Sequence, residues 1–206
     1  MSSSESLRDR HIVERLSSAG YVVVHDFMNP DSVLELRESL QELQVMHRMH
    51  RAGVGQGKSL VVMDEIRGDF VSWIDTEVSE GPHRQYLSRL EGLRQMVNQR
   101  LMLGLFEFEG HFACYPPGAF YRRHLDQFQN DSHRTLTCIL YLNPDWQERD
   151  GGQLRLYLNG DDLSECIDIL PTAGTLVTFL SSNFWHEVLP ATRERMSLTG
   201  WFKTRA

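Results

Sequence analysis

The stretch TLTCILYLN (residues 135–143) is a short run of mostly apolar and β-branched residues that ends where turn-forming residues begin. It is one of eight such runs between about residue 105 and the C-terminus. Short strands with turn signals at regular intervals are typical of antiparallel sandwiches and barrels. We therefore predict a double-sheet jelly roll whose other strands lie in GHFACY (110–115), AFYRRHLD (119–126), GQLRLYL (152–158), ECIDIL (165–170), GTLVTFLS (174–181), WHEVLPA (185–191) and RMSLTGWFKT (195–204).

The residues before this region follow a helical pattern. SLRDRHIVERLSSAG (6–20) reads as a helix with a glycine stop, and YVVVHDF (21–27) follows as a strand. A second helix begins after Asn29, and GPHRQYLSRLEGLRQMVNQRLM (81–102) predicts a third. We expect one domain over 1–206, in which a helical and mixed part (1–104) buttresses a jelly-roll core (105–206).

Composition excludes several classes of protein. Twenty-eight acidic residues against 21 basic ones give a net charge of −7, which argues against a nucleic-acid partner. The densest basic spot, HRMHR (47–51), is interpreted as a solvated helix end. No apolar run approaches the roughly 20 residues that span a bilayer, so we expect no membrane association. The start MSSSESLRDR lacks a signal sequence and the cysteines number three, so we expect a cytoplasmic location.

The glycine-rich segment RAGVGQGKSL (51–60) has the loose spacing of a phosphate-binding loop. That loop must follow a buried strand and open a helix, whereas this segment follows a helix and leads into the irregular stretch LVVMDEIRGDF (60–70). The order therefore argues against a nucleotide site. We interpret Gly53, Gly55 and Gly57 as part of a mobile loop.

Two histidines and an aspartate carry the strongest chemical signal. In YRRHLDQF, His124 and Asp126 lie two residues apart at a probable strand end, so both side chains face the same way. His186 follows sixty residues later at the start of another strand, which a jelly roll can place opposite the first. Two histidines and one carboxylate form a facial triad that binds Fe(II) and leaves three coordination positions open. The spacings between the cysteines match no structural zinc site.

Arg195 lies nine residues after His186, at the head of a strand. Strand alternation places Arg195, Ser197, Thr199 and Trp201 on one face. An inward arginine requires an anion, and its planar fork suits a carboxylate, such as the far end of a dicarboxylate that binds the metal. The alternative is a structural ion pair with Glu187 or Glu194.

Together these residues resemble the Fe(II)/2-oxoglutarate dioxygenases, and among them prolyl 4-hydroxylases of the oxygen-sensing, hypoxia-inducible factor type. The resemblance runs through EIRGDFVSWID, CYPPGAFYRRHLD, RTLTCILYLN, DGGQLRLY and HEVLPATRERMSLTGWF. It implies that His124, Asp126 and His186 bind iron and that Arg195 binds the distal carboxylate of 2-oxoglutarate. It further implies 2-oxoglutarate contacts from Tyr141, Tyr115 and Thr199.

The resemblance also implies substrate contacts. Tyr121, Arg134 and Trp201 match positions near the target proline, although a tyrosine or tryptophan on a strand is often plain core. The loop at about 50–81 matches one that folds over the substrate, with Arg67 and Asp69 as candidate contacts.

We therefore expect a prolyl 4-hydroxylase that acts on an exposed proline-containing loop of a protein and releases succinate and CO2, with O2 as co-substrate and ascorbate as a supporting reductant. Oxygen sensing is the role that the resemblance implies. For a bacterial source, elongation factor Tu is the first candidate substrate, and otherwise a transcription factor. The rival hypotheses are a dioxygenase of free amino acids or other small molecules, and a jelly-roll module that binds without catalysis.

Overall fold

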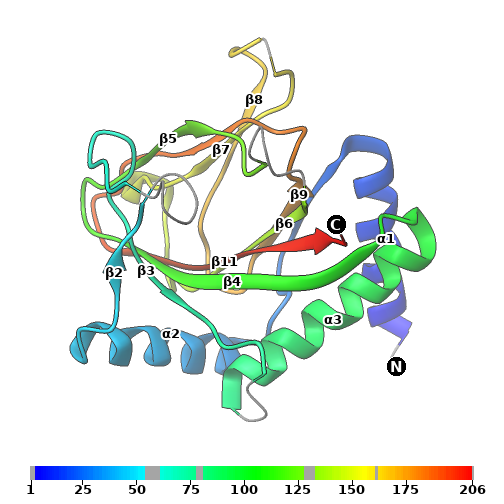
Figure 1. Cartoon of the computed structure of the whole chain (residues 1–206), viewed down its shortest axis with the longest axis horizontal. Helices are drawn as coiled ribbons and strands as arrows, with labels where there is room; N and C mark the ends of the chain where they lie inside the picture. The colour runs from blue at the N-terminus through cyan, green and yellow to red at the C-terminus, as the bar shows by residue number, and fades with distance from the viewer. Residues whose placement is uncertain (1–2, 54–60, 78–80, 128–132, 161, 206) are drawn as a thin grey trace.

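The computed structural model (Figure 1) describes residues 3–53, 61–77, 81–127, 133–160 and 162–205. Two antiparallel sheets face each other. The larger has seven strands in the order β1-β9-β6-β11-β4-β3-β2, and the smaller has four in the order β5-β10-β7-β8. The strands are β1 (Tyr21–Val24), β2 (His50–Arg51), β3 (Phe70–Trp73), β4 (Leu105–Tyr115), β5 (Tyr121–His124), β6 (Arg134–Tyr141), β7 (Leu154–Tyr157), β8 (Cys166–Ile169), β9 (Leu176–Leu180), β10 (His186–Val188) and β11 (Arg195–Thr204).

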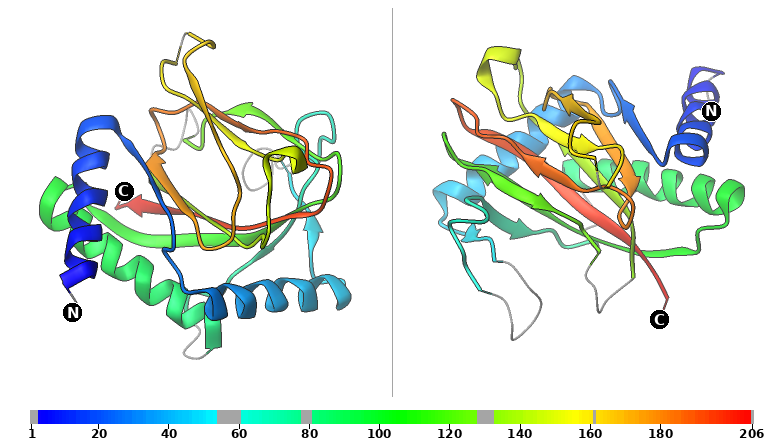
Figure 2. Two further views of the ribbon diagram at one scale, coloured as in Figure 1. Left: turned by 180° about the vertical axis from the view of Figure 1, so that it is seen from behind. Right: turned by 90° about the horizontal axis from the view of Figure 1, so that it is seen from above.

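Three helices cover the outer face and one end of the large sheet. They are α1 (Ser3–Ala19), α2 (Pro30–Val45) and α3 (Gly81–Leu101). Figure 1 and the left view of Figure 2 show α2 and α3 on one side of β4 and β11, with the small sheet on the other side. The main hydrophobic core fills the space between helices and sheet, where Leu36, Leu90 and Val97 pack with Phe112 and Leu198.

The predicted jelly roll and its helical buttresses are confirmed. Asn29 caps α2 as its side chain accepts a hydrogen bond from the Ser32 amide at 2.9 Å, and Pro30 opens the helix. Alternation along β11 also matches the prediction. Its odd-numbered residues face the second sheet, whereas Met196 and Leu198 enter the core beneath the helices.

The large sheet differs from the prediction because residues before 105 supply three of its strands. β1 pairs with β9, so Tyr21 lies opposite Phe179, and β3 pairs with β4, so Phe70 lies opposite Cys114. β4 also begins at Leu105, five residues before the predicted run. These pairings join segments that are far apart in the chain. A local apolar pattern identifies a strand but not its partner.

The glycine-rich segment is described only as far as Gly53. Gly55 and Gly57, on which the prediction of a mobile loop rests, lie outside the described residues. No helix in the described part of the chain combines the length and apolar character needed to cross a bilayer.

Candidate active site

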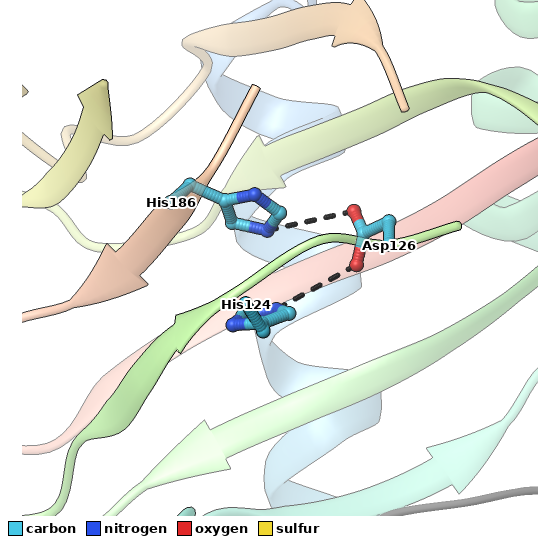
Figure 3. A group of neighbouring side chains, drawn as sticks. All are labelled: His124, Asp126 and His186. Carbon is cyan, nitrogen blue, oxygen red and sulfur yellow. Dashed lines mark ion pairs between the residues drawn. The ribbon is translucent and has the colours of Figure 1, made fainter. Parts of the chain in front are cut away.

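The predicted metal ligands meet on the inner face of the small sheet. Strands β5 and β10 pair so that His186 lies directly opposite His124, and Asp126 follows β5 by two residues. His124 Nε2 lies 3.6 Å from one oxygen of Asp126, and His186 Nε2 lies 3.5 Å from the other (Figure 3). One ligand atom from each residue lies within 4.8 Å of the others. The sheet register therefore builds the triad.

Hydrogen bonds fix the orientation of each ligand. The Nδ1 atom of His124 donates to the Arg122 carbonyl at 2.8 Å, and that of His186 donates to the Phe184 carbonyl at 3.0 Å. Because a carbonyl can only accept, the neutral form of each imidazole carries its proton on Nδ1 and its lone pair on Nε2. Thr137 Oγ1 donates to Asp126 at 2.8 Å. All three ligands are thus held by neighbours before any metal binds.

The charge states of two ligands suit a cation. Burial alone would raise the pKa of Asp126, but the imidazoles of His186 and His124 hold it below its ordinary value. Burial, together with His124, lowers the pKa of His186 to about 4. At neutral pH the site therefore presents a carboxylate and a neutral imidazole, which are the forms that bind metal.

The spacing of the ligands fits an octahedral ion. Metal–ligand bonds of about 2.1 Å place adjacent corners of an octahedron about 3 Å apart. The two histidine nitrogens lie 3.5 and 3.6 Å from the two oxygens of the Asp126 carboxylate, which is close to that value. Three ligands on one face leave the opposite face free for other molecules.

Arg195 provides a buried cation beside the triad. It is only 1% exposed and pairs in register with Tyr115, and its Nε donates to the Gly152 carbonyl at 2.8 Å. A Cβ atom on Gly152, whose φ is +69°, would lie 3.2 Å from Arg195 Cδ and 2.9 Å from the Ala191 side chain. Only glycine therefore fits at position 152, where the backbone carbonyl accepts the hydrogen bond from Arg195.

Arg195 has no acidic partner among the residues that the structure describes. Of the two acids considered, Glu187 accepts a hydrogen bond from Tyr157 at 2.7 Å, and Glu194 accepts one from Gln44 at 2.8 Å. The structural ion pair is therefore absent. The guanidinium is left with donors for an incoming anion.

Two phenols lie against the guanidinium. The rings of Tyr115 and Tyr141 lie 5.1 and 5.0 Å from its central carbon. The Tyr141 hydroxyl is buried and has no partner in the described part of the chain, and burial raises the pKa of Tyr141 to about 12. Burial likewise raises the pKa of Tyr115. Both groups stay protonated and can donate to a carboxylate, and Thr199 lies on the same face of β11.

The triad and Arg195 open into one cavity of about 900 Å³. Its lining includes the remaining predicted side chains except Tyr141 and Asp69, namely Tyr115, Thr199, Tyr121, Arg134, Trp201 and Arg67. Arg134 lies 3.6 Å above the Trp201 ring and pairs with Glu109 at 2.8 Å. Trp201 is therefore a wall of the cavity as well as a packed side chain.

The structure corrects the interpretation of Asp69. This carboxylate is 1% exposed, and it receives hydrogen bonds from Arg67 at 2.7 and 2.6 Å, so it cannot reach a partner chain. Arg67 lies 4.2 Å from the Tyr121 ring, which stacks on His124 with centroids 3.6 Å apart. Asp69 therefore supports a metal ligand through two intervening side chains.

Sequence reasoning missed several residues of the cavity wall, and two of them, His111 and Trp73, pack against each other. His111 lies on the same face of β4 as Tyr115, so strand alternation identifies it. Burial lowers its pKa to about 4. Trp73 packs edge-on against His111 with centroids 5.2 Å apart, yet it remains 59% exposed. The only sequence signal for Trp73 is its position in EIRGDFVSWID, one of the stretches that carry the family resemblance.

Comparisons with known proteins agree with this geometry. Residues 110–203 match the 2OG-Fe(II) oxygenase superfamily. The fold superimposes on a prolyl-4-hydroxylase from Pseudomonas putida with a TM-score of 0.85 and 43% identity, over 96% of this chain and 100% of the other. A Trichoplax adhaerens prolyl hydroxylase, solved with a peptide of the hypoxia inducible factor oxygen degradation domain, gives 0.84 and 28%, over 98% and 94%.

Among curated relatives, human Egl nine homolog 1 is 31% identical over 93% of this chain and 46% of its own length. The chain thus spans about half the length of that relative.

Proposed function

Because the chain belongs to the 2OG-Fe(II) oxygenase superfamily and, within it, to the prolyl 4-hydroxylases, we propose that it hydroxylates a prolyl residue of a protein. Fe(II) is the metal, and 2-oxoglutarate and O2 are the co-substrates. One observation carries the proposal: a His-Asp-His triad and a buried arginine, which has no acidic partner in the described part of the chain, share a cavity that extends to an exposed tryptophan.

Each part of the cavity has a separate task. When bound, iron supplies the activation of O2, which is coupled to decarboxylation of 2-oxoglutarate to succinate and CO2. His124, Asp126 and His186 would hold the ion on one face. Arg195 would bind the distal carboxylate through paired N–H donors, and the Tyr141 hydroxyl would donate to the same group.

The opposite wall would orient the prolyl residue. Tyr121 stacks on His124 and so would lie next to the bound metal, and Trp201 and Arg134 form a flat aromatic and cationic surface across the cavity. Flat rings suit the ring of proline, and their bulk excludes water from the reacting carbon. Trp73 and the residues of β2 continue this surface outward.

A dioxygenase of small molecules is the second candidate. An enclosed pocket would favour a small substrate, but here the wall ends in a tryptophan that is 59% exposed, which favours a longer, peptide-like substrate.

Prolyl hydroxylation is tested by incubation with cell lysate, Fe(II) and 2-oxoglutarate, followed by mass spectrometry for one added oxygen on proline. Turnover with a free amino acid and none with proteins would favour the second candidate. A metal-binding protein without any 2-oxoglutarate turnover would be a non-catalytic module.

The proposal also covers the substrate, the reductant, the response to O2 and the location of the protein. The substrate is an exposed proline-containing loop, and elongation factor Tu is the first candidate if the source is bacterial. Ascorbate maintains activity by keeping iron reduced, and activity follows the O2 concentration, as a sensor requires. A cytoplasmic location agrees with three free cysteines. Activity measured against graded O2, with and without ascorbate, tests both enzymatic assignments.

A further inference from the structure

The basic segment HRMHR does not end α2 as a freely solvated turn. The helix ends at Val45, and His47 adopts a left-handed conformation with φ of 54°. The backbone N–H groups of His47 and Arg48 donate to the Gln44 and Leu43 carbonyls at 3.0 and 2.9 Å. This hydrogen-bonded turn redirects the chain into β2. As a result, four basic side chains line the outer part of the catalytic cavity: His47, Arg48, His50 and Arg51. We call them the basic rim.

Most cations of the cavity already have an acidic partner. Arg67 pairs with Asp69, Arg134 pairs with Glu109, and Arg51 of the rim pairs with Asp64. Arg195 is the proposed partner of 2-oxoglutarate.

Arg48, which is exposed like Arg51, differs from these cations because it forms no ion pair with any residue that the structure describes. The two acidic residues of the cavity lining, Asp126 and Glu109, are both engaged elsewhere. The rim therefore carries one uncompensated positive charge and two further imidazoles.

The positive charge of the basic rim is opposite in sign to the net charge of the whole chain, which is −7. An acidic partner would be repelled by the protein as a whole, so a local positive rim gives it a single favourable orientation. The rim lines the same cavity as the iron ligands, so a chain that places its proline at the metal site has a path past Arg48. A peptide fits this arrangement better than a nucleic acid, because a net charge of −7 repels a phosphate at every nucleotide more strongly than a peptide with one acidic residue.

We propose that the basic rim binds the carboxylate of an acidic residue that flanks the target proline. The substrate segment is therefore acidic, and Arg48 is the residue that selects it. This inference rests on the proposed function, because it takes the occupant of the cavity to be a proline-containing segment.

The test measures peptide binding without turnover. Short fluorescent peptides carry one proline flanked by glutamates, by glutamines or by lysines, and Mn(II) replaces Fe(II) in the presence of 2-oxoglutarate. Binding is followed by anisotropy. An exposed ion pair predicts that the glutamate peptide binds about 2- to 5-fold tighter than the glutamine peptide and that added salt removes this preference.

Three variants sharpen the measurement. Arg48→Gln should abolish the preference for glutamate, and Arg48→Glu should reverse it in favour of the lysine peptide. Arg100→Gln is the matched control, since Arg100 is an exposed arginine near the end of α3 that does not line the cavity. It should keep the preference of the unmodified protein.

Equal affinity for the glutamate and glutamine peptides, or a preference that survives Arg48→Glu, would overturn the inference. Displacement of the labelled glutamate peptide by a short oligonucleotide at a lower concentration than by the unlabelled glutamate peptide would assign the rim to nucleic acid and also overturn the inference. Hydroxylation is assayed separately. If the glutamate preference holds but no proline gains oxygen, the basic rim binds acidic peptides as inferred, and the proposed function is wrong.

Discussion

Replacement of Arg195 by lysine tests how the co-substrate is held. Arg195→Lys keeps the positive charge but removes the planar fork, and it also removes the 2.8 Å hydrogen bond from Nε to the Gly152 carbonyl. A lysine ammonium can satisfy one carboxylate oxygen where the guanidinium satisfies two. Loss of one charged hydrogen bond costs about 1.5–3 kcal/mol, which corresponds to a roughly 10- to 150-fold rise in the half-saturating 2-oxoglutarate concentration.

The assay compares 2-oxoglutarate with 2-oxobutanoate, which has the same keto acid end but no distal carboxylate. Decarboxylation is measured with each, and binding to the Mn(II) protein is measured by calorimetry. The unmodified protein should strongly prefer 2-oxoglutarate, and Arg195→Lys should narrow this preference while 2-oxobutanoate binding changes little. Tyr141→Phe removes a neutral hydrogen bond of about 0.5–1.5 kcal/mol. It should therefore reduce the preference for 2-oxoglutarate over 2-oxobutanoate by a smaller factor, roughly 2- to 12-fold.

A preference unchanged in Arg195→Lys would refute this reasoning and leave Arg195 as a support for the Gly152 turn. Thermal unfolding of the metal-free variant serves as the control, because a loss of fold would weaken the binding of both keto acids equally. In a variant whose thermal unfolding is unchanged, a matched decrease for the two compounds would also contradict a role of Arg195 in carboxylate recognition.

Three further predictions follow from the site. His124→Ala and Asp126→Ala should each abolish Mn(II) binding and turnover with thermal unfolding near that of the unmodified protein, and turnover in either variant would end the assignment of the triad. Arg67→Ala leaves the Asp69 carboxylate buried without its partner and should lower the free energy of unfolding by about 3–5 kcal/mol in urea titrations, whereas removing both residues should cost less than the sum of the single changes. The pKa of His111 is about 4 in the folded state and about 6.5 when unfolded, so the unfolded chain binds more protons in this window. His111 should therefore lower stability by roughly 3 kcal/mol as pH drops from 6.5 to 4, in addition to the loss from His186, and His111→Leu should remove the His111 share; a pH profile unaltered by this substitution would contradict the burial of a neutral imidazole at position 111.

Much of the site follows from local periodicity. Side chains alternate along a strand, so the spacing of His124 and Asp126 and the parity of Arg195 with Thr199 and Trp201 specify shared faces without knowledge of the fold. The cap at Asn29 and the proline after it likewise depend on adjacent residues. Such features depend only on neighbours in the chain, and for these the structure agrees with the prediction.

Other features depend on which segments meet, and local sequence does not encode this. Strand pairing places His186 opposite His124, and β3 beside β4 brings Trp73 against His111. Arg67 and Asp69 look alike as substrate contacts in the sequence, but the tertiary structure buries the carboxylate and turns the arginine toward Tyr121.

The segment HRMHR shows the same limit. Its composition predicts a solvated helix end, and each of its arginines is indeed exposed. A left-handed residue at His47 redirects the chain there, and the packing of β2 on β3 then fixes which surface the basic side chains face. The sequence alone thus determined the chemical groups and their faces within each element. The tertiary structure decided which groups share a cavity, because long-range pairing depends on the burial and hydrogen bonds of the whole chain and not on any single segment.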